Sequence, residues 1–91
     1  MNLDTIIKRN PDIISADMKG ETVMMSISTG KYHSINAIGA SIWELISKPL
    51  KVSDLIDSLL EEYEVDRATC EAQVLDFLKD ALEVEVVLIV E

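Results

Sequence analysis

The first third of the chain contains strand-like runs of apolar and polar residues, and over Thr22–Ser28 the two kinds alternate, apart from Met24, with the period of two that is typical of β-strands. The runs Ile13–Met18 and Glu21–Ser28 flank the dipeptide Lys19-Gly20, and two such runs around a short glycine turn indicate a hairpin. A second turn at Ser28-Thr29-Gly30 leads into a third run, Lys31–Ile35. The pattern therefore predicts an antiparallel meander of three strands.

The alternation also assigns faces to the second run. Val23, Met25 and Ile27 alternate with polar residues, so they form the predicted apolar face, with Met24 as the exception on the other face.

The third run is short and half polar. Tyr32 and Ile35 are three positions apart, which departs from strict alternation, so we expect a bulge or a strong twist between them. Such a strand suits the edge of a sheet, where its unpaired main-chain groups can receive another chain.

The period then changes to that of amphipathic helices. Asn36 is the predicted N-cap of a first helix that ends at Ser47-Lys48-Pro49, because proline disfavours helical geometry in the residue before it. A second helix begins at Val52 or Ser53, and a third begins near Asp66, whose carboxylate suits an N-cap. The first two helices carry apolar stripes at Ile38, Ile42, Leu45 and Ile46, and at Leu55, Ile56, Leu59, Leu60 and Tyr63.

The third helix has an apolar arc that is wider than the roughly 100° stripe needed for packing on one core, so it is expected to contact two surfaces. Val74 and Leu78 lie at the centre of the arc, where core packing is the expected role, and Phe77 lies on a flank. The full arc comprises Ala68, Cys70, Val74, Leu75, Phe77, Leu78, Ala81 and Leu82. The tail Glu83–Glu91 alternates again and predicts a final strand.

These elements predict an α+β fold in one domain over residues 1–91, with a sheet at about 13–36 and helices at about 37–82. A three-stranded antiparallel sheet followed by three helices, with a C-terminal strand, is similar to a winged helix-turn-helix.

The net charge of −9 is uneven: residues 1–48 hold five acids and five bases, and residues 49–91 hold twelve acids and three bases. Such a field repels nucleic acid and anionic membranes, so neither is an expected partner. The stretch Met1–Asp12 lacks the apolar segment of a secretory signal, and the longest apolar run, Val86–Val90, is too short to cross a bilayer. We therefore expect a cytoplasmic protein.

Residues for catalysis or metal binding are scarce. His33 and Cys70 are the only histidine and cysteine, and together they are too few for a zinc site, which needs three or four protein ligands. No carboxylate has a companion that suggests a catalytic pair. We expect neither enzyme activity nor a cofactor.

Several motifs, taken together, are similar to the PqqD-like family of small proteins that recognise ribosomally made precursor peptides. They are Gly20-Glu21, Thr29-Gly30-Lys31-Tyr32, Ile35-Asn36 with Gly39, Ile42-Trp43-Glu44-Leu45, and Val52 with Leu55 and Ile56. The step Tyr63-Glu64-Val65-Asp66 is most similar to that of the free-standing leader-binding proteins of lasso-peptide biosynthesis. One departure is Leu82-Glu83-Val84, where many relatives end the third helix with Gly-Leu-Leu or Gly-Leu-Ile.

The resemblance implies that a leader peptide adds as a strand to the third strand and rests against the third helix. It implies presentation of the precursor to a transglutaminase-like leader protease, with the lasso cyclase as a further candidate partner. The implied leader-binding residues are Lys31, Tyr32, His33, Ser34, Ile35, Cys70, Val74, Phe77, Leu78 and Ala81, with Glu71, Asp76 and Asp80 as candidates for electrostatic attraction.

A different interpretation also fits the sequence. The chain could be a self-associating, acidic interaction or regulatory module that pairs with a second copy through Val84–Val90.

Overall fold

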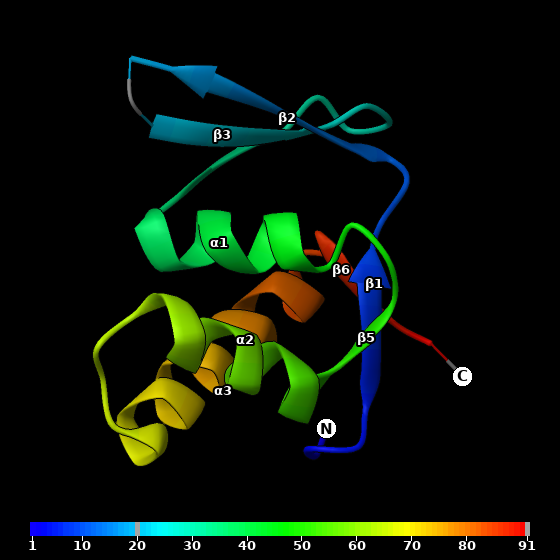
Figure 1. Ribbon diagram of the computed structural model, residues 1–91. Coiled ribbons are helices and arrows are strands. Elements are labelled where there is room, and N and C mark those ends of the chain that lie inside the picture. The colour runs from blue at the N-terminus through cyan, green and yellow to red at the C-terminus, as the bar shows by residue number, and fades with distance from the viewer. Residues whose placement is uncertain (20, 91) are drawn as a thin grey trace.

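The computed structural model describes residues 1–19 and 21–90, and it confirms the predicted α+β class. Its elements are β1 (Ile6–Arg9), β2 (Ile13–Met18), β3 (Glu21–Ser26), β4 (Tyr32–Ile35), α1 (Ala37–Leu45), β5 (Leu50–Lys51), α2 (Val52–Glu62), α3 (Arg67–Glu83) and β6 (Val87–Val90). Figure 1 shows α1 between the β2–β3 hairpin on one side and α2 and α3 on the other. Within the described ranges, no helix combines the length and apolar character needed to cross a membrane.

The strands form two antiparallel sheets. The predicted meander is confirmed as the sheet ordered β2-β3-β4; of the turn that joins its first two strands, Gly20 lies outside the described residues. A second sheet, ordered β5-β1-β6, was not predicted, and it pairs Ile6 with Val90 and Arg9 with Val87. The predicted final strand is thus confirmed as β6. It gains main-chain bonds from β1 and does not need a second copy of the chain for them.

Both predicted N-caps are confirmed. The side chain of Asn36 accepts a hydrogen bond from the N–H of Gly39 at 2.8 Å and begins α1 immediately after β4. The carboxylate of Asp66 accepts bonds from the N–H of Thr69 at 3.0 Å and from its hydroxyl at 2.7 Å. These bonds hold the pKa of Asp66 below its ordinary value.

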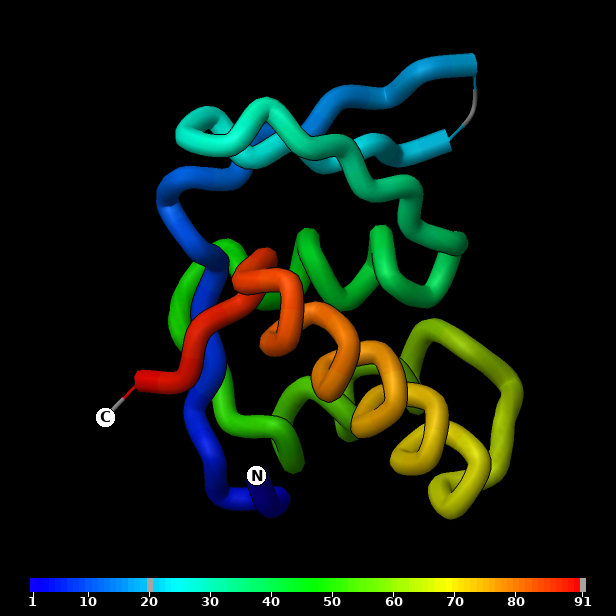
Figure 2. The backbone as a smooth tube through the Cα atoms, turned by 180° about the vertical axis from the view of Figure 1, so that it is seen from behind, coloured from blue at the N-terminus to red at the C-terminus, as the bar shows by residue number. Residues whose placement is uncertain are grey.

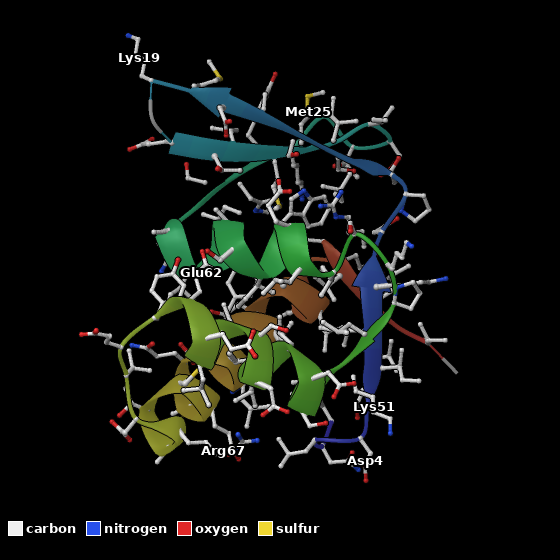
Figure 3. The ribbon with its side chains drawn as sticks, viewed as in Figure 1. Asp4, Lys19, Met25, Lys51, Glu62 and Arg67 are labelled. Carbon is white, nitrogen blue, oxygen red and sulfur yellow. The ribbon has the colours of Figure 1, made fainter. Side chains whose placement is uncertain are left out.

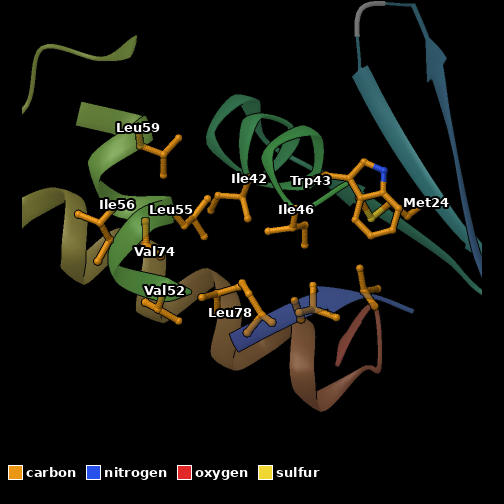
Figure 4. Close-up of a cluster of buried hydrophobic side chains, with 14 of the residues drawn as sticks. Met24, Ile42, Trp43, Ile46, Val52, Leu55, Ile56, Leu59, Val74 and Leu78 are labelled. Atoms are coloured by element: carbon orange, nitrogen blue, oxygen red, sulfur yellow. The ribbon is translucent and has the colours of Figure 1, made fainter. Parts of the chain in front are cut away.

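The core lies between the three helices and the strands β1 and β6 (Figure 4). Each large apolar side chain that is fully buried there contributes about 1.5–3 kcal/mol relative to exposure. The predicted stripes of α1 and α2 are confirmed, and the fully or almost fully buried residues include Ile7, Met24, Ile42, Ile46, Leu55, Ile56, Leu59, Val74, Leu78 and Val87.

The apolar face predicted for β3 points away from the core, and the buried face is the one that carries Met24. Met24 is fully buried and lies beside Trp43 of α1 (Figure 4), while Ile27 is 60% exposed. Val23 and Met25 alternate with Met24, so they lie on the outer face of the sheet. Met24 and Trp43 are both members of the buried core, so the inner face of β3 packs toward α1.

Candidate functional site

The free edge of β4 is the first component of the candidate site. β4 ends the order β2-β3-β4, so one of its edges has no partner among the described strands. The N–H of Ser26 donates to the carbonyl of Lys31 at 3.0 Å, and this bond identifies which residues of β4 form hydrogen bonds with β3. Since successive residues of a strand bond to opposite sides, His33 bonds to β3, whereas Tyr32 and Ser34 direct their N–H and C=O groups to the open edge.

A β-bulge immediately precedes β4. Gly30, at φ +71°, donates its N–H to the carbonyl of Ser26 at 2.8 Å, and the next residue, Lys31, faces the same Ser26. Two residues opposite one, the first a left-handed glycine, form a G1 bulge. The bulge predicted between Tyr32 and Ile35 is wrong, because pairing with β3 continues through both residues without interruption. Tyr32 and Ile35 lie on opposite faces of β4: the first is 69% exposed and the second is half-buried.

Asp12 anchors the turn that leads into this bulge. Its carboxylate accepts hydrogen bonds from the hydroxyl of Ser26 at 2.6 Å, and from the hydroxyl and N–H of Ser28 at 2.7 and 3.0 Å. The bond from the Ser26 hydroxyl is the largest influence that holds the pKa of Asp12 below its ordinary value, followed by the bond from the Ser28 hydroxyl. Asp12 therefore fixes the entry into β4, a role that the sequence pattern did not indicate.

A groove of about 270 Å³ lies between β4 and the C-terminal part of α3. Figure 2 shows residues 30–36 passing above the orange end of α3. One side of the groove is formed by His33, Ser34, Ile35 and Asn36, and the other by Phe77, Asp80, Ala81, Val84 and Val86. We call it the β4–α3 groove.

The groove continues at both ends. Toward the start of α1 it shares Asn36, Phe77 and Asp80 with a hollow of about 430 Å³. Toward the bulge it shares His33 and Val84 with a hollow of about 320 Å³. The concave surface therefore runs along the whole length of β4, which is the shape that an extended peptide requires.

The residues predicted on α3 fall into two groups. Val74 and Leu78 are fully buried in the core, and Cys70 is almost so, which raises the pKa of its thiol. These three belong to the core and do not line the groove or its continuations. Phe77 and Ala81 line the groove itself.

The predicted charged residues differ in whether they line the groove. Asp80 lines the groove and its continuation, and Asp76 lines the continuation only. Glu71 does not line any part of it.

Of the predicted β4 residues, Lys31 lies at the bulge end and Tyr32 on the outer face. Val84 lines the groove from the end of α3; its alternation with later valines had placed it in the final strand, which instead begins at Val87.

Known proteins share this architecture. The family model for coenzyme PQQ synthesis protein D (PqqD) matches residues 21–87, well over half of the chain. The structure of TbiB1 in complex with the TbiA(beta) leader peptide has a TM-score of 0.78 and 31% identity, covering 88% of this chain and 93% of that one. Lasso peptide synthetase B1 complexed with the leader peptide has a similar fold, with a TM-score of 0.77 and 23% identity, covering 90% of this chain and 96% of that one.

Among curated proteins, a comparison gave no match. The matched range 21–87 contains β3, β4 and all three helices, and so it includes both walls of the β4–α3 groove. The chain belongs to the PqqD family.

Proposed function

We propose that this protein binds the leader segment of a ribosomally synthesised precursor peptide, of the kind that matures into a lasso peptide, by strand addition to β4. The observation that carries the proposal is the open edge at Tyr32 and Ser34, directly beside the β4–α3 groove. TbiB1, which is 31% identical, is in complex with a leader peptide, and this supports the same class of ligand here.

The main chain of the leader would pair with β4. Tyr32 and Ser34 each offer one N–H and one C=O, so an added strand gains about four main-chain hydrogen bonds. These bonds fix the register of the leader without regard to its sequence. Selectivity then comes from alternate side chains, which point into the groove.

The groove favours apolar leader residues. An inward side chain would meet Ile35 on one wall and Phe77 and Ala81 on the other. Burial of one branched aliphatic residue there contributes about 1.5–3 kcal/mol. With the main-chain bonds, we expect binding in the nanomolar to micromolar range, roughly −8 to −12 kcal/mol.

Asp76 and Asp80 give the α1 end of the groove a negative charge. A basic leader residue placed there would form exposed ion pairs, each contributing roughly 0–1 kcal/mol. Their main effect is therefore on the rate of encounter.

We infer that the protein has no turnover of its own. It would hold the precursor for a transglutaminase-like leader protease, and for the cyclase that closes the ring. His33 lies along the groove, where it serves to contact a peptide, and the buried thiol of Cys70 is kept protonated by its raised pKa.

Amide hydrogen exchange with a synthetic leader from a neighbouring precursor gene tests the proposal. Leader binding should slow exchange at Tyr32 and Ser34, while His33, already bonded to β3, serves as the internal control. Saturable binding that leaves Tyr32 and Ser34 unprotected would rule out strand addition at β4, and no binding would rule out the function.

A further inference from the structure

The sheet that contains β4 has a second open edge, at β2. The N–H of Ile27 donates to the carbonyl of Asp12 at 2.9 Å, and this bond identifies which residues of β2 form hydrogen bonds with β3. By alternation, Ser15 and Asp17 direct their N–H and C=O groups away from β3. The N–H of Ile13 is already used by the carbonyl of Asn10 at 3.0 Å. The open donors of this edge are therefore those of Ser15 and Asp17.

A groove of about 410 Å³ lies beside this edge, between β2 and α1. It shares no lining residue with the β4–α3 groove or with that groove's two continuations. A hollow of about 370 Å³ lies between the two grooves: it shares Thr22 and Ala40 with this one and Ser34, Ile35 and Asn36 with the β4–α3 groove. The lining of the groove between β2 and α1 comprises Ser15, Ala16, Asp17, Thr22, Ala40, Ser41, Trp43, Glu44, Leu45 and Glu62. We call it the β2–α1 groove.

Hydrogen bonds fix the floor of this groove. The indole N–H of Trp43 donates to the hydroxyl of Ser15 at 3.2 Å, which links α1 to β2. The hydroxyls of Ser41 and Tyr63 lie 2.6 Å apart and link α1 to the end of α2. The groove is therefore formed by three elements whose relative positions are set before any ligand arrives.

The charge of the groove indicates which occupant it fits. Of the described residues that line it, Asp17, Glu44 and Glu62 are acidic, and none is Lys, Arg or His. In the described part of the chain, the one salt bridge joins Arg67 to Asp57 at 2.8 Å, outside this groove. Figure 3 shows Glu62 beside the left end of α1, and Lys19 farther away at the tip of the hairpin; Lys19 does not line the groove. Asp17 accepts a hydrogen bond from the Thr22 hydroxyl at 3.2 Å and Glu62 one from the Ser41 hydroxyl at 3.5 Å, but among the described residues no cation pairs with any of the three carboxylates.

We propose that the β2 edge is a second strand-addition site, which receives an extended, basic segment of a partner polypeptide. Lys or Arg residues at inward positions would reach the carboxylates, and main-chain groups would pair with Ser15 and Asp17. Apolar residues at outward positions would contact Ile14 and Met18, which are 48% and 59% exposed. A second copy of this chain does not fit, because it would bring like carboxylates together.

The probe for this site is a peptide of alternating Lys and Val, with a matched peptide of alternating Glu and Val as control. We expect the Lys peptide to slow amide exchange at Ser15 and Asp17, and the Glu peptide to leave both unchanged. Glu62→Gln should raise the dissociation constant of the Lys peptide roughly two- to fivefold, since exposed ion pairs contribute up to about 1 kcal/mol. Glu61→Gln removes the same charge from an adjacent exposed position outside the groove and should have no such effect.

Three results would overturn the proposal. The first is exchange that stays fast at Ser15 and Asp17, including the case in which the peptide protects Tyr32 and Ser34 instead. The second is equal weakening by Glu61→Gln and Glu62→Gln, which would show that only net charge matters. The third is protection of the β2 edge without peptide, together with a dimer in sedimentation. None of these results would contradict leader binding at β4.

Discussion

The ring of Phe77 lies against the backbone of Gly39: a Cβ placed on Gly39 would be 2.7 Å from Cε2 of Phe77. Carbon atoms in contact are separated by about 3.5–4.0 Å, so only glycine fits without displacement of the ring. Through this contact, the first turn of α1 sets the position of a side chain that lines the β4–α3 groove.

Gly39→Ala should therefore weaken leader binding by moving Phe77. Alanine favours a helix over glycine by about 1 kcal/mol, so the loss would come from the clash and not from helix propensity. In a Phe77→Ala background the clash with the ring is absent, and only the closer contacts of 3.2 Å to Asn36 Oδ1 and to Cβ of Ile35 remain. Gly39→Ala should therefore cost less stability in that background than in the wild type. Urea denaturation and leader titration of the four proteins measure both effects. A single variant Gly39→Ala with unchanged affinity would contradict this role of the contact.

Substitutions of Phe77 and Leu78 should have different effects: the first should mainly weaken leader binding, and the second should mainly lower the stability of the fold. Phe77 is half-buried and lines the groove, so Phe77→Ala should lower leader affinity more than it lowers stability. Leu78 is fully buried in the core, so Leu78→Ala should cost about 2–5 kcal/mol of unfolding free energy. Calorimetric titration below the unfolding transition should show near-normal leader affinity for Leu78→Ala. If Phe77→Ala lowered stability and left leader affinity unchanged, its main role would be in core packing and not in the groove.

Arg9 should stabilise the junction between β1 and α1. Its Nε and Nη2 atoms donate to the carbonyl of Trp43 at 2.9 and 2.7 Å, and its guanidinium lies 4.5 Å from the centroid of the indole ring. The side chain of lysine has one donor nitrogen and cannot reproduce both of these bonds to one carbonyl oxygen, so Arg9→Lys should cost about 1–2 kcal/mol. Chemical denaturation followed by tryptophan fluorescence measures this loss, and a variant as stable as the wild type would contradict it.

Acid should weaken the turn before β4. The pKa of Asp12 lies below its ordinary value of 3.8 because of the hydroxyls of Ser26 and Ser28. A lowered folded-state pKa stabilises the fold above the unfolded-state pKa, and this contribution is lost as the pH falls through the folded-state pKa. The free energy of unfolding should therefore decline below about pH 4, and Asp12→Asn should make the decline less steep. Urea denaturation between pH 7 and pH 3 measures both slopes, and identical slopes would contradict the role of Asp12.

The elements that could be predicted from the sequence are those with local causes. Asn36 and Asp66 cap helices through bonds to residues three positions away, and the β2–β3 hairpin depends on neighbouring residues. In contrast, β1 could not be predicted, because four residues that include Lys8 and Arg9 become a strand only through distant partners, β5 in the middle of the chain and β6 at its far end.

The candidate site was predictable only in outline. The wide apolar arc of α3 indicated two contact surfaces, and Val74, at its centre, is buried in the core as expected, while Phe77, on its flank, lines the groove. The role of Asn36 and Val84 in lining the groove depends instead on how β4 packs against α3, which the sequence pattern does not show. Likewise, Gly30 marks the bulge before β4 once its positive φ is known, whereas the spacing of Tyr32 and Ile35 suggested a different place.

The most direct test of strand addition at β4 is to measure the leader affinity of Ser34→Pro and to compare it with that of Ser34→Ala. The Ser34 N–H faces the open edge, so proline removes a donor that the fold itself does not use, while alanine keeps it. Ile35→Pro would instead break the β3–β4 ladder. We predict that Ser34→Pro keeps its stability but binds the leader about tenfold or more weakly, from a lost bond of about 1 kcal/mol plus the steric clash of the proline ring. Ser34→Ala should bind as the wild type does. A folded Ser34→Pro variant that binds the leader as tightly as Ser34→Ala would contradict strand addition at β4.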